Sequence, residues 1–158
     1  MPVHERLRFL LRVIDKEVKH LDYAARQAFS EGVSVARMAS LDDDPALALQ
    51  VEAFVSRFCR LQDTLGDKLL PAVLSALGEP PAAHLINLDK AERFGWLDSA
   101  EKWLQMRQLR NQMIHEYIED VQTFTDAIQA AIQSQPQLQR FAQRLAEVCR
   151  EDIFTAHP

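Results

Sequence analysis

The sequence predicts an all-α protein, and three observations lead to this prediction. The 158-residue chain has only four glycines and is rich in residues that favour helices. Apolar residues recur every three or four positions, and no stretch alternates as a strand would. The segments are joined by short connections, which favour antiparallel neighbours in an up-and-down bundle. We expect one domain over residues 1–158, with a four-helix core and additional helices.

The first expected helix covers residues 3–29. Its apolar face consists of Leu7, Leu10, Leu11, Ile14, Val18 and Leu21. A connector with room for one short helix follows at residues 33–44. Asp44 before Pro45 is a typical start for the next helix, because the carboxylate can cap the first turn and proline fits its first position.

The second and third expected helices cover residues 45–77 and about 81–94. In the second helix, Gly66 and Pro71 predict a kink or a division, because proline removes a backbone hydrogen bond and clashes with the preceding turn. Gly95 predicts the end of the third helix.

The fourth expected helix begins after a cap at Asp98 or Ser99 and should end or bend after Tyr117, where Glu119-Asp120 looks like the cap of the next helix. A fifth helix is expected over about 120–134. Pro136 should open a sixth, so that residues 136–158 form an extra C-terminal helix.

Composition limits the function. The net charge of −5 excludes a uniformly basic nucleic-acid binder, so any contact with nucleic acid needs a local patch. Cys59 and Cys149 lie within helical patterns, as buried free thiols of a cytoplasmic protein would. No apolar run is long enough to suggest a membrane span. Glu17 and His20 have the Glu-x-x-His spacing of carboxylate-bridged metal sites, but the second pair is missing, so we expect no metal ligands and no cofactor.

The fourth helix contains a cluster of polar side chains. Its apolar stripe consists of Trp103, Met106, Met113, Ile114 and Tyr117. Arg110 falls in the middle of that stripe, where a guanidinium needs an anionic partner or water. Asn111 and His115 are four residues apart and share a flank of the helix.

This segment, Arg110-Asn111-Gln112-Met113-Ile114-His115-Glu116-Tyr117, resembles the HEPN superfamily signature Arg-polar-x-x-x-His. It is more narrowly similar to the Arg-x-x-x-x-His-x-Tyr motif of HepT-type toxins, over about residues 5–135. The resemblance implies a HEPN-like bundle and a homodimer whose two motifs line one cleft. It also implies a ribonuclease toxin of a type VII-like toxin–antitoxin pair, silenced when a partner nucleotidyltransferase of the MNT type adenylylates Tyr117.

The residue types fit metal-independent RNA cleavage. The imidazole of His115 can move protons near neutral pH, and the fork of Arg110 can stabilise charge on phosphorus. Asn111 can orient the imidazole or bind a phosphate oxygen. Arg107 and Lys102 are candidates for binding further phosphates. Arg110 and His115 lie roughly 140° apart around a helix, so one subunit alone would not bring them together.

Other interpretations remain open at this stage. Arg110 could pair with a buried carboxylate, His115 could cap a helix end, and Tyr117 could be a packed aromatic residue. The whole chain could serve as a non-catalytic substrate-binding or adaptor subunit of a nucleotidyltransferase, or as a structural helical protein. The fold alone does not distinguish these functions.

Overall fold

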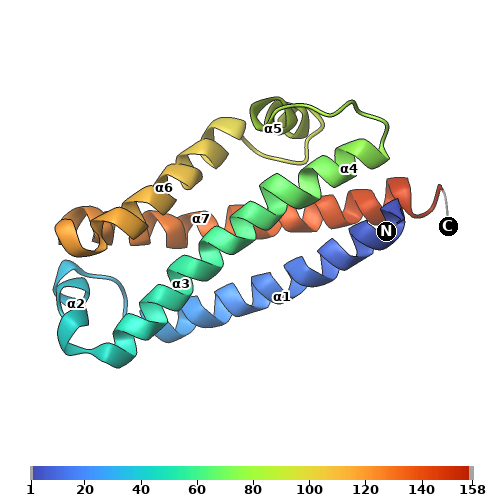
Figure 1. Ribbon diagram of the computed structural model, residues 1–158. Coiled ribbons are helices and arrows are strands. Elements are labelled where there is room, and N and C mark those ends of the chain that lie inside the picture. The colour runs from blue at the N-terminus through green and yellow to red at the C-terminus, as the bar shows by residue number, and fades with distance from the viewer. Residues whose placement is uncertain (1, 157–158) are drawn as a thin grey trace.

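The computed structural model describes residues 2–156, apart from the side chain of Ile118, and every regular element in that range is helical (Figure 1). The predicted all-α class is confirmed. No helix within the described range has both the length and the hydropathy required to cross a membrane.

Helix α1 (Val3–Phe29) packs against a long helical rod that runs back alongside it (Figure 1). The rod consists of α3 (Pro45–Asp63), the π-helical segment η2 (Thr64–Leu69) and α4 (Leu70–Ala76). The predicted cap is present, since the Asp44 carboxylate accepts a hydrogen bond from the backbone N–H of Leu47 at 3.1 Å.

The predicted irregularity near Gly66 and Pro71 takes the form of a widened turn. The N–H of Leu70 donates to the carbonyl of Leu65, five residues earlier instead of four. A widened turn directly before Pro71 accommodates the proline ring, which would clash with the carbonyl of a regular α-helix. The helix therefore continues through both residues.

The two connections contain short helices. Residues 33–44 hold α2 (Val35–Ala39) and the 3₁₀ turn η1 (Leu41–Asp43). The third expected helix is α5 (His84–Arg93), which ends before Gly95, a glycine with a φ of 79°. A residue with a side chain would be strained in that left-handed conformation.

Helices α6 (Ala100–Glu119) and α7 (Val121–Val148) fold back on each other (Figure 1). Ser99 caps α6 by accepting from the N–H of Lys102 at 3.1 Å. Asp120 caps α7 by accepting from two backbone N–H groups of its first turn, both at 3.1 Å. The predicted boundary between the fourth and fifth helices is thus set by local capping.

The expected separate helix after Pro136 is wrong, because Pro136 lies inside α7. Beyond the proline, Leu138, Phe141 and Leu145 are all buried in the core. Their burial outweighs the local cost of a proline in a helix, which is about 3 kcal/mol. The π-helical segment η3 (Cys149–Ile153) extends the same helix.

The core lies between α1, the α3–α4 rod, α6 and α7. Its largest fully buried side chains are Trp103, Phe54, Phe58, Phe124 and Phe141. Cys59 and Cys149 are both buried free thiols, as the sequence predicted. The Trp103 indole packs edge-on against Phe141 with ring centroids 5.2 Å apart, so it fixes α6 to α7.

Candidate functional site

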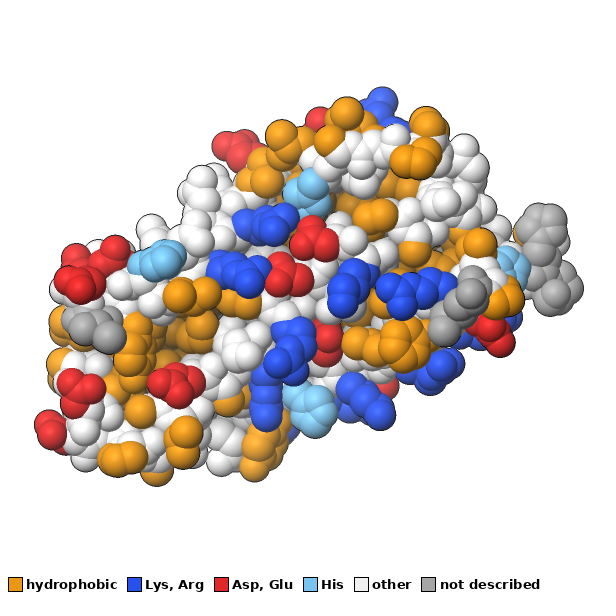
Figure 2. Space-filling model, viewed as in Figure 1, with side chains coloured by type: hydrophobic (Ala, Val, Ile, Leu, Met, Phe, Trp, Pro, Cys, Tyr) orange, Lys and Arg blue, Asp and Glu red, His pale blue; other side chains and the backbone are white. Residues whose placement is uncertain are grey.

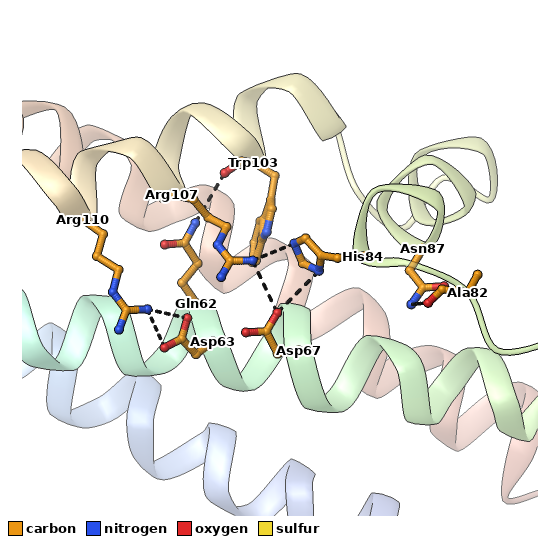
Figure 3. Close-up of polar contacts among 9 residues, drawn as sticks. All are labelled: Gln62, Asp63, Asp67, Ala82, His84, Asn87, Trp103, Arg107 and Arg110. Atoms are coloured by element: carbon orange, nitrogen blue, oxygen red, sulfur yellow. Dashed lines mark hydrogen bonds and ion pairs between the residues drawn. The ribbon is translucent and has the colours of Figure 1, made fainter.

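The motif arginine turns from α6 toward the α3–α4 rod. One nitrogen of Arg110, Nη1, donates to both carboxylate oxygens of Asp63, at 2.8 and 2.7 Å (Figure 3). These hydrogen bonds raise the pKa of the Arg110 guanidinium. The Arg110 and Asp63 side chains are 38% and 34% exposed. Arg110 therefore has a carboxylate partner, but one at the surface, and its Nε and Nη2 make no hydrogen bond to the described residues.

A second cluster lies one turn away on α6 and the α3–α4 rod, and it also includes His84 of α5. Nη1 of Arg107 donates to Nε2 of His84 at 3.0 Å and lies 3.5 Å from Oδ1 of Asp67 (Figure 3). Because Nε2 accepts, the ring proton belongs on Nδ1, which is 3.4 Å from the same Asp67 oxygen. Burial, and then the nearby Arg107 charge, lower the pKa of His84, while Asp67 opposes them. Arg107 therefore already has partners within the protein.

Glycine at position 66 allows these elements to approach. A Cβ atom built on Gly66 would lie 3.0 Å from Cζ2 of Trp103 and 3.2 Å from Cε1 of His84. The Trp103 indole N–H is buried without a hydrogen-bond partner, and its backbone carbonyl accepts from Gln62 Nε2 at 3.4 Å (Figure 3). The π-helical turn thus packs directly against α6 and presents Asp67 beside it.

A cavity of about 780 Å³ lies between α3, η2 and α6. Its apolar lining comes from Val51, Val55, Cys59, Met113 and Ile114. Its charged lining comes from Glu52, Asp63, Asp67, Arg60, Lys68 and Arg110. This volume falls in the range of small-molecule sites, roughly 300–1,000 Å³. The lining has as many acidic as basic side chains, so the cavity carries little net charge. Its two ends nevertheless differ in charge.

Tyr117 lines the same cavity. Its ring packs edge-on against Phe124 at 5.2 Å between centroids, and the residue remains partly exposed. Burial raises the pKa of the Tyr117 phenol, and the negative charges of Glu52 and Asp42 raise it further. Tyr117 is therefore a packed aromatic residue that still borders a ligand-sized cavity.

The other motif residues, Asn111 and His115, do not line this cavity, although Asn111 shares a second depression of about 530 Å³ with Arg110. His115 and Asn111 are exposed, and His115 does not line the cavity of Arg110. Within the described part of the chain, His115 makes no hydrogen bond or ion pair, so it does not cap a helix end. Lys102 is exposed near the start of α6. One protomer therefore brings Arg110 and Tyr117 to one cavity and leaves His115 on another face of α6.

Sequence reasoning missed Asp63, Asp67 and His84. Asp63 and Asp67 are four residues apart, a spacing that places both carboxylates on one helix face opposite Arg107 and Arg110. The matching spacing of the two acidic and two basic side chains could have indicated these ion pairs from the sequence. Nothing in the local sequence of His84 marked it, because its partners come from two other elements.

Comparisons with protein-family models, curated proteins and solved structures found no match. In residues 2–156, no group of three or more His, Cys, Asp or Glu side chains is placed to hold a metal ion.

Proposed function

We propose that the protein is a HEPN-like ribonuclease toxin of the HepT type, which cleaves RNA through Arg110, Asn111 and His115. The observation that carries this proposal is the hydrogen bonding of the Arg110 guanidinium. Asp63 holds the guanidinium through one nitrogen and leaves two donating positions free for a phosphate. The antiparallel four-helix core typical of that superfamily is part of the proposal, with α1, the α3–α4 rod, α6 and α7 as its helices.

In the proposed reaction, the ribose 2′-hydroxyl attacks the adjacent phosphate. The new P–O2′ bond forms as the P–O5′ bond breaks, which leaves a 2′,3′-cyclic phosphate and a free 5′-hydroxyl. His115 takes the 2′-hydroxyl proton and delivers it to the departing 5′-oxygen. Arg110 stabilises the added negative charge on the phosphoryl oxygens, and Asn111 orients the imidazole.

The imidazole beside each Arg110 would come from a second copy of the chain. Arg110 and His115 occupy different faces of α6, so a two-fold axis beside this helix would join the arginine of one subunit to the histidine of the other. Ile114, which lies between them in sequence and is 52% exposed, supports this arrangement, because a dimer would cover its apolar side chain. The proposed toxin is accordingly a homodimer.

The test of this function is cleavage of single-stranded RNA by the purified protein with and without EDTA. We expect equal rates, because the proposed mechanism moves protons and stabilises charge with side chains alone. The products should carry 2′,3′-cyclic phosphate ends, which mass spectrometry detects. Activity that EDTA removes and a divalent ion restores would contradict the mechanism.

The proposed silencing partner is a nucleotidyltransferase that adenylylates Tyr117. In that step the phenol oxygen attacks the α-phosphorus of ATP, the bond to pyrophosphate breaks, and a base accepts the phenol proton. Because its pKa is raised, the phenol stays protonated at neutral pH, so the transferase must supply the base. The added phosphate would place negative charge in the cavity of Arg110 and obstruct RNA.

Tyr117→Phe separates silencing from cleavage. The ring can still pack on Phe124, so we expect the melting temperature and the RNA cleavage rate to stay near those of the wild type. The variant should gain no AMP by intact mass spectrometry when it is incubated with the partner transferase and ATP, and it should stay active. An adduct on Tyr117→Phe equal to that on wild type would place the modification elsewhere.

One observation favours a second function, that of a non-catalytic adaptor subunit of a nucleotidyltransferase. Arg110 and Tyr117 share a cavity large enough for a nucleotide, and that cavity does not involve His115. An adaptor would bind a nucleotide there by calorimetry and would cleave no RNA. The cleavage assay above therefore distinguishes the two functions.

A further inference from the structure

Three cations beside the proposed site have no acidic partner. Seven of the 18 lysine and arginine side chains form ion pairs: Lys19 with Asp15, Arg26 with Asp22, Lys90 with Glu79, Arg107 with Asp67, Arg110 with Asp63, and Arg140 and Arg144 with Asp98. Among the described residues, no carboxylate lies within ion-pair distance of Arg57, Arg60 or Lys68. What sets these three apart is their position, because they follow one another along a single helical rod and line two adjoining cavities, where their charges can attract an anionic ligand.

The three cations connect to the site of Arg110. Arg60 and Lys68 line the 780 Å³ cavity that Arg110 also lines. Arg60 additionally lines a neighbouring depression of about 240 Å³, together with Arg57, His20 and Glu17. Figure 2 shows Lys and Arg side chains gathered across the middle of this face, where α3 passes between α6 and α1. We call Arg57, Arg60 and Lys68 the basic track.

The carboxylates within this region do not cancel the track. Asp63 and Asp67 are bound by Arg110 and by Arg107 with His84. Glu17 accepts from Oγ1 of Thr64 at 3.0 Å through one oxygen, and its other oxygen is buried. Burial raises the pKa of Glu17, against the opposing effects of Thr64 and Arg60. Glu17 thus lines the depression, but one of its carboxylate oxygens is buried and the other accepts from Thr64.

The far end of the cavity has the opposite charge. Tyr117 lies in the field of Glu52 and Asp42, whose negative charges help to raise its pKa. Figure 2 shows further acidic side chains at the end of the molecule where α2 lies. A polyanion is attracted at Arg60 and Lys68 and repelled near Tyr117. The charges therefore favour entry of a polyanion from the end of the cavity at Arg60 and Lys68.

We infer that single-stranded RNA binds along the basic track and reaches the proposed site of Arg110 from that end, leaving the end at Tyr117 open. This inference depends on the proposed ribonuclease function. Arg57 and Lys68 are eleven residues apart in sequence, and the helical rise between them is about 16 Å. That length accommodates more than one phosphate of an extended strand. The cations would bind the backbone and would not select bases.

The test uses a labelled 2′-O-methyl oligouridine, which lacks the attacking hydroxyl, and follows its binding to the full-length protein by fluorescence anisotropy at several salt concentrations. The variant Arg57→Gln/Arg60→Gln/Lys68→Gln should bind at least about tenfold more weakly at low salt. The slope of log affinity against log salt should fall by about 2, since each lost phosphate contact on a single strand contributes about 0.7. Thermal melting would establish that the variant is folded, and Arg60→Gln alone provides a milder change.

The matched control is Arg26→Gln/Arg93→Gln/Arg150→Gln, which removes three exposed positive charges from α1, α5 and η3. Its affinity should stay within about twofold of the wild-type value at the ionic strength of a cell, where distant charges are screened. An equal loss of affinity in both triple variants, or an unchanged affinity in the track variant, would show that RNA does not bind along the basic track.

The experiments distinguish an error in the basic track from an error in the proposed ribonuclease function. If the wild-type protein cleaves RNA but the track variant binds the oligonucleotide as tightly as wild type does, the track is wrong and the function stands. If the wild-type protein neither binds nor cleaves RNA, the proposed function is wrong and the track falls with it.

Discussion

Replacing His115 by alanine is expected to lower the rate of RNA cleavage by about 10²–10⁴-fold, the usual contribution of a single acid–base group. The side chain is exposed and has no hydrogen-bond partner among the described residues, so its loss should leave the melting temperature unchanged. Arg110→Ala should reduce cleavage on a similar scale through lost charge stabilisation. Arg110→Lys should not restore it, because one ammonium group cannot both bond the two Asp63 oxygens and present a fork to phosphate.

Mixing the two inactive proteins tests whether the site is shared between subunits. If subunits exchange freely, about half of the dimers pair Arg110→Ala with His115→Ala, and each of these regains one complete set of residues. Activity should then recover to about a quarter of the wild-type level. A site formed within one protomer would give no recovery. His115→Ala or Arg110→Ala protein that is well folded and cleaves RNA at the wild-type rate would exclude the ribonuclease mechanism.

Helix boundaries set by local chemistry were predictable from the sequence. Asp44, Ser99 and Asp120 each accept hydrogen bonds from N–H groups within three residues, so capping depends on short segments alone. Pro136 followed a different rule. Its expected helix break is a local effect, and burial of the residues on both sides, which depends on distant helices, outweighed it.

In the functional site, too, the local sequence indicated some features, and others depend on segments far away in the chain. The position of Arg110 within an apolar stripe indicated that it needs an anionic partner, but Asp63 lies 47 residues earlier and could not be identified from the motif. Arg107 and Lys102 were candidates for phosphate binding because they are close to the motif in sequence. In the structure Arg107 is engaged with Asp67 and His84, and the unpaired cations beside Arg110 come from α3 and η2.

Trp103 connects the elements that hold the motif helix in place. Its indole packs on Phe141 of α7, its ring approaches Gly66 of η2, and its carbonyl accepts from Gln62 of α3. With only 1% of its surface exposed, it contributes most of its area to the core. Trp103→Ala should therefore lower the free energy of unfolding by about 3–5 kcal/mol, as large-to-small core substitutions do. Urea denaturation measures this change, and a loss below about 1 kcal/mol would show that α6 is anchored elsewhere.

A second pair of variants tests the contact with Gly66 itself. Gly66→Ala places a methyl group 3.0 Å from the Trp103 ring, so we expect a destabilisation of about 1–3 kcal/mol from overpacking, less the gain of about 1 kcal/mol from the better helix former. Trp103→Phe removes the Cζ2 and Nε1 atoms that the methyl would meet and leaves only the contact with Cε1 of His84 at 3.2 Å. In that background Gly66→Ala should cost less than it does in the wild type, which gives a favourable interaction energy in a double-mutant cycle. Equal effects of Gly66→Ala in both backgrounds would show that the indole does not require glycine at this position.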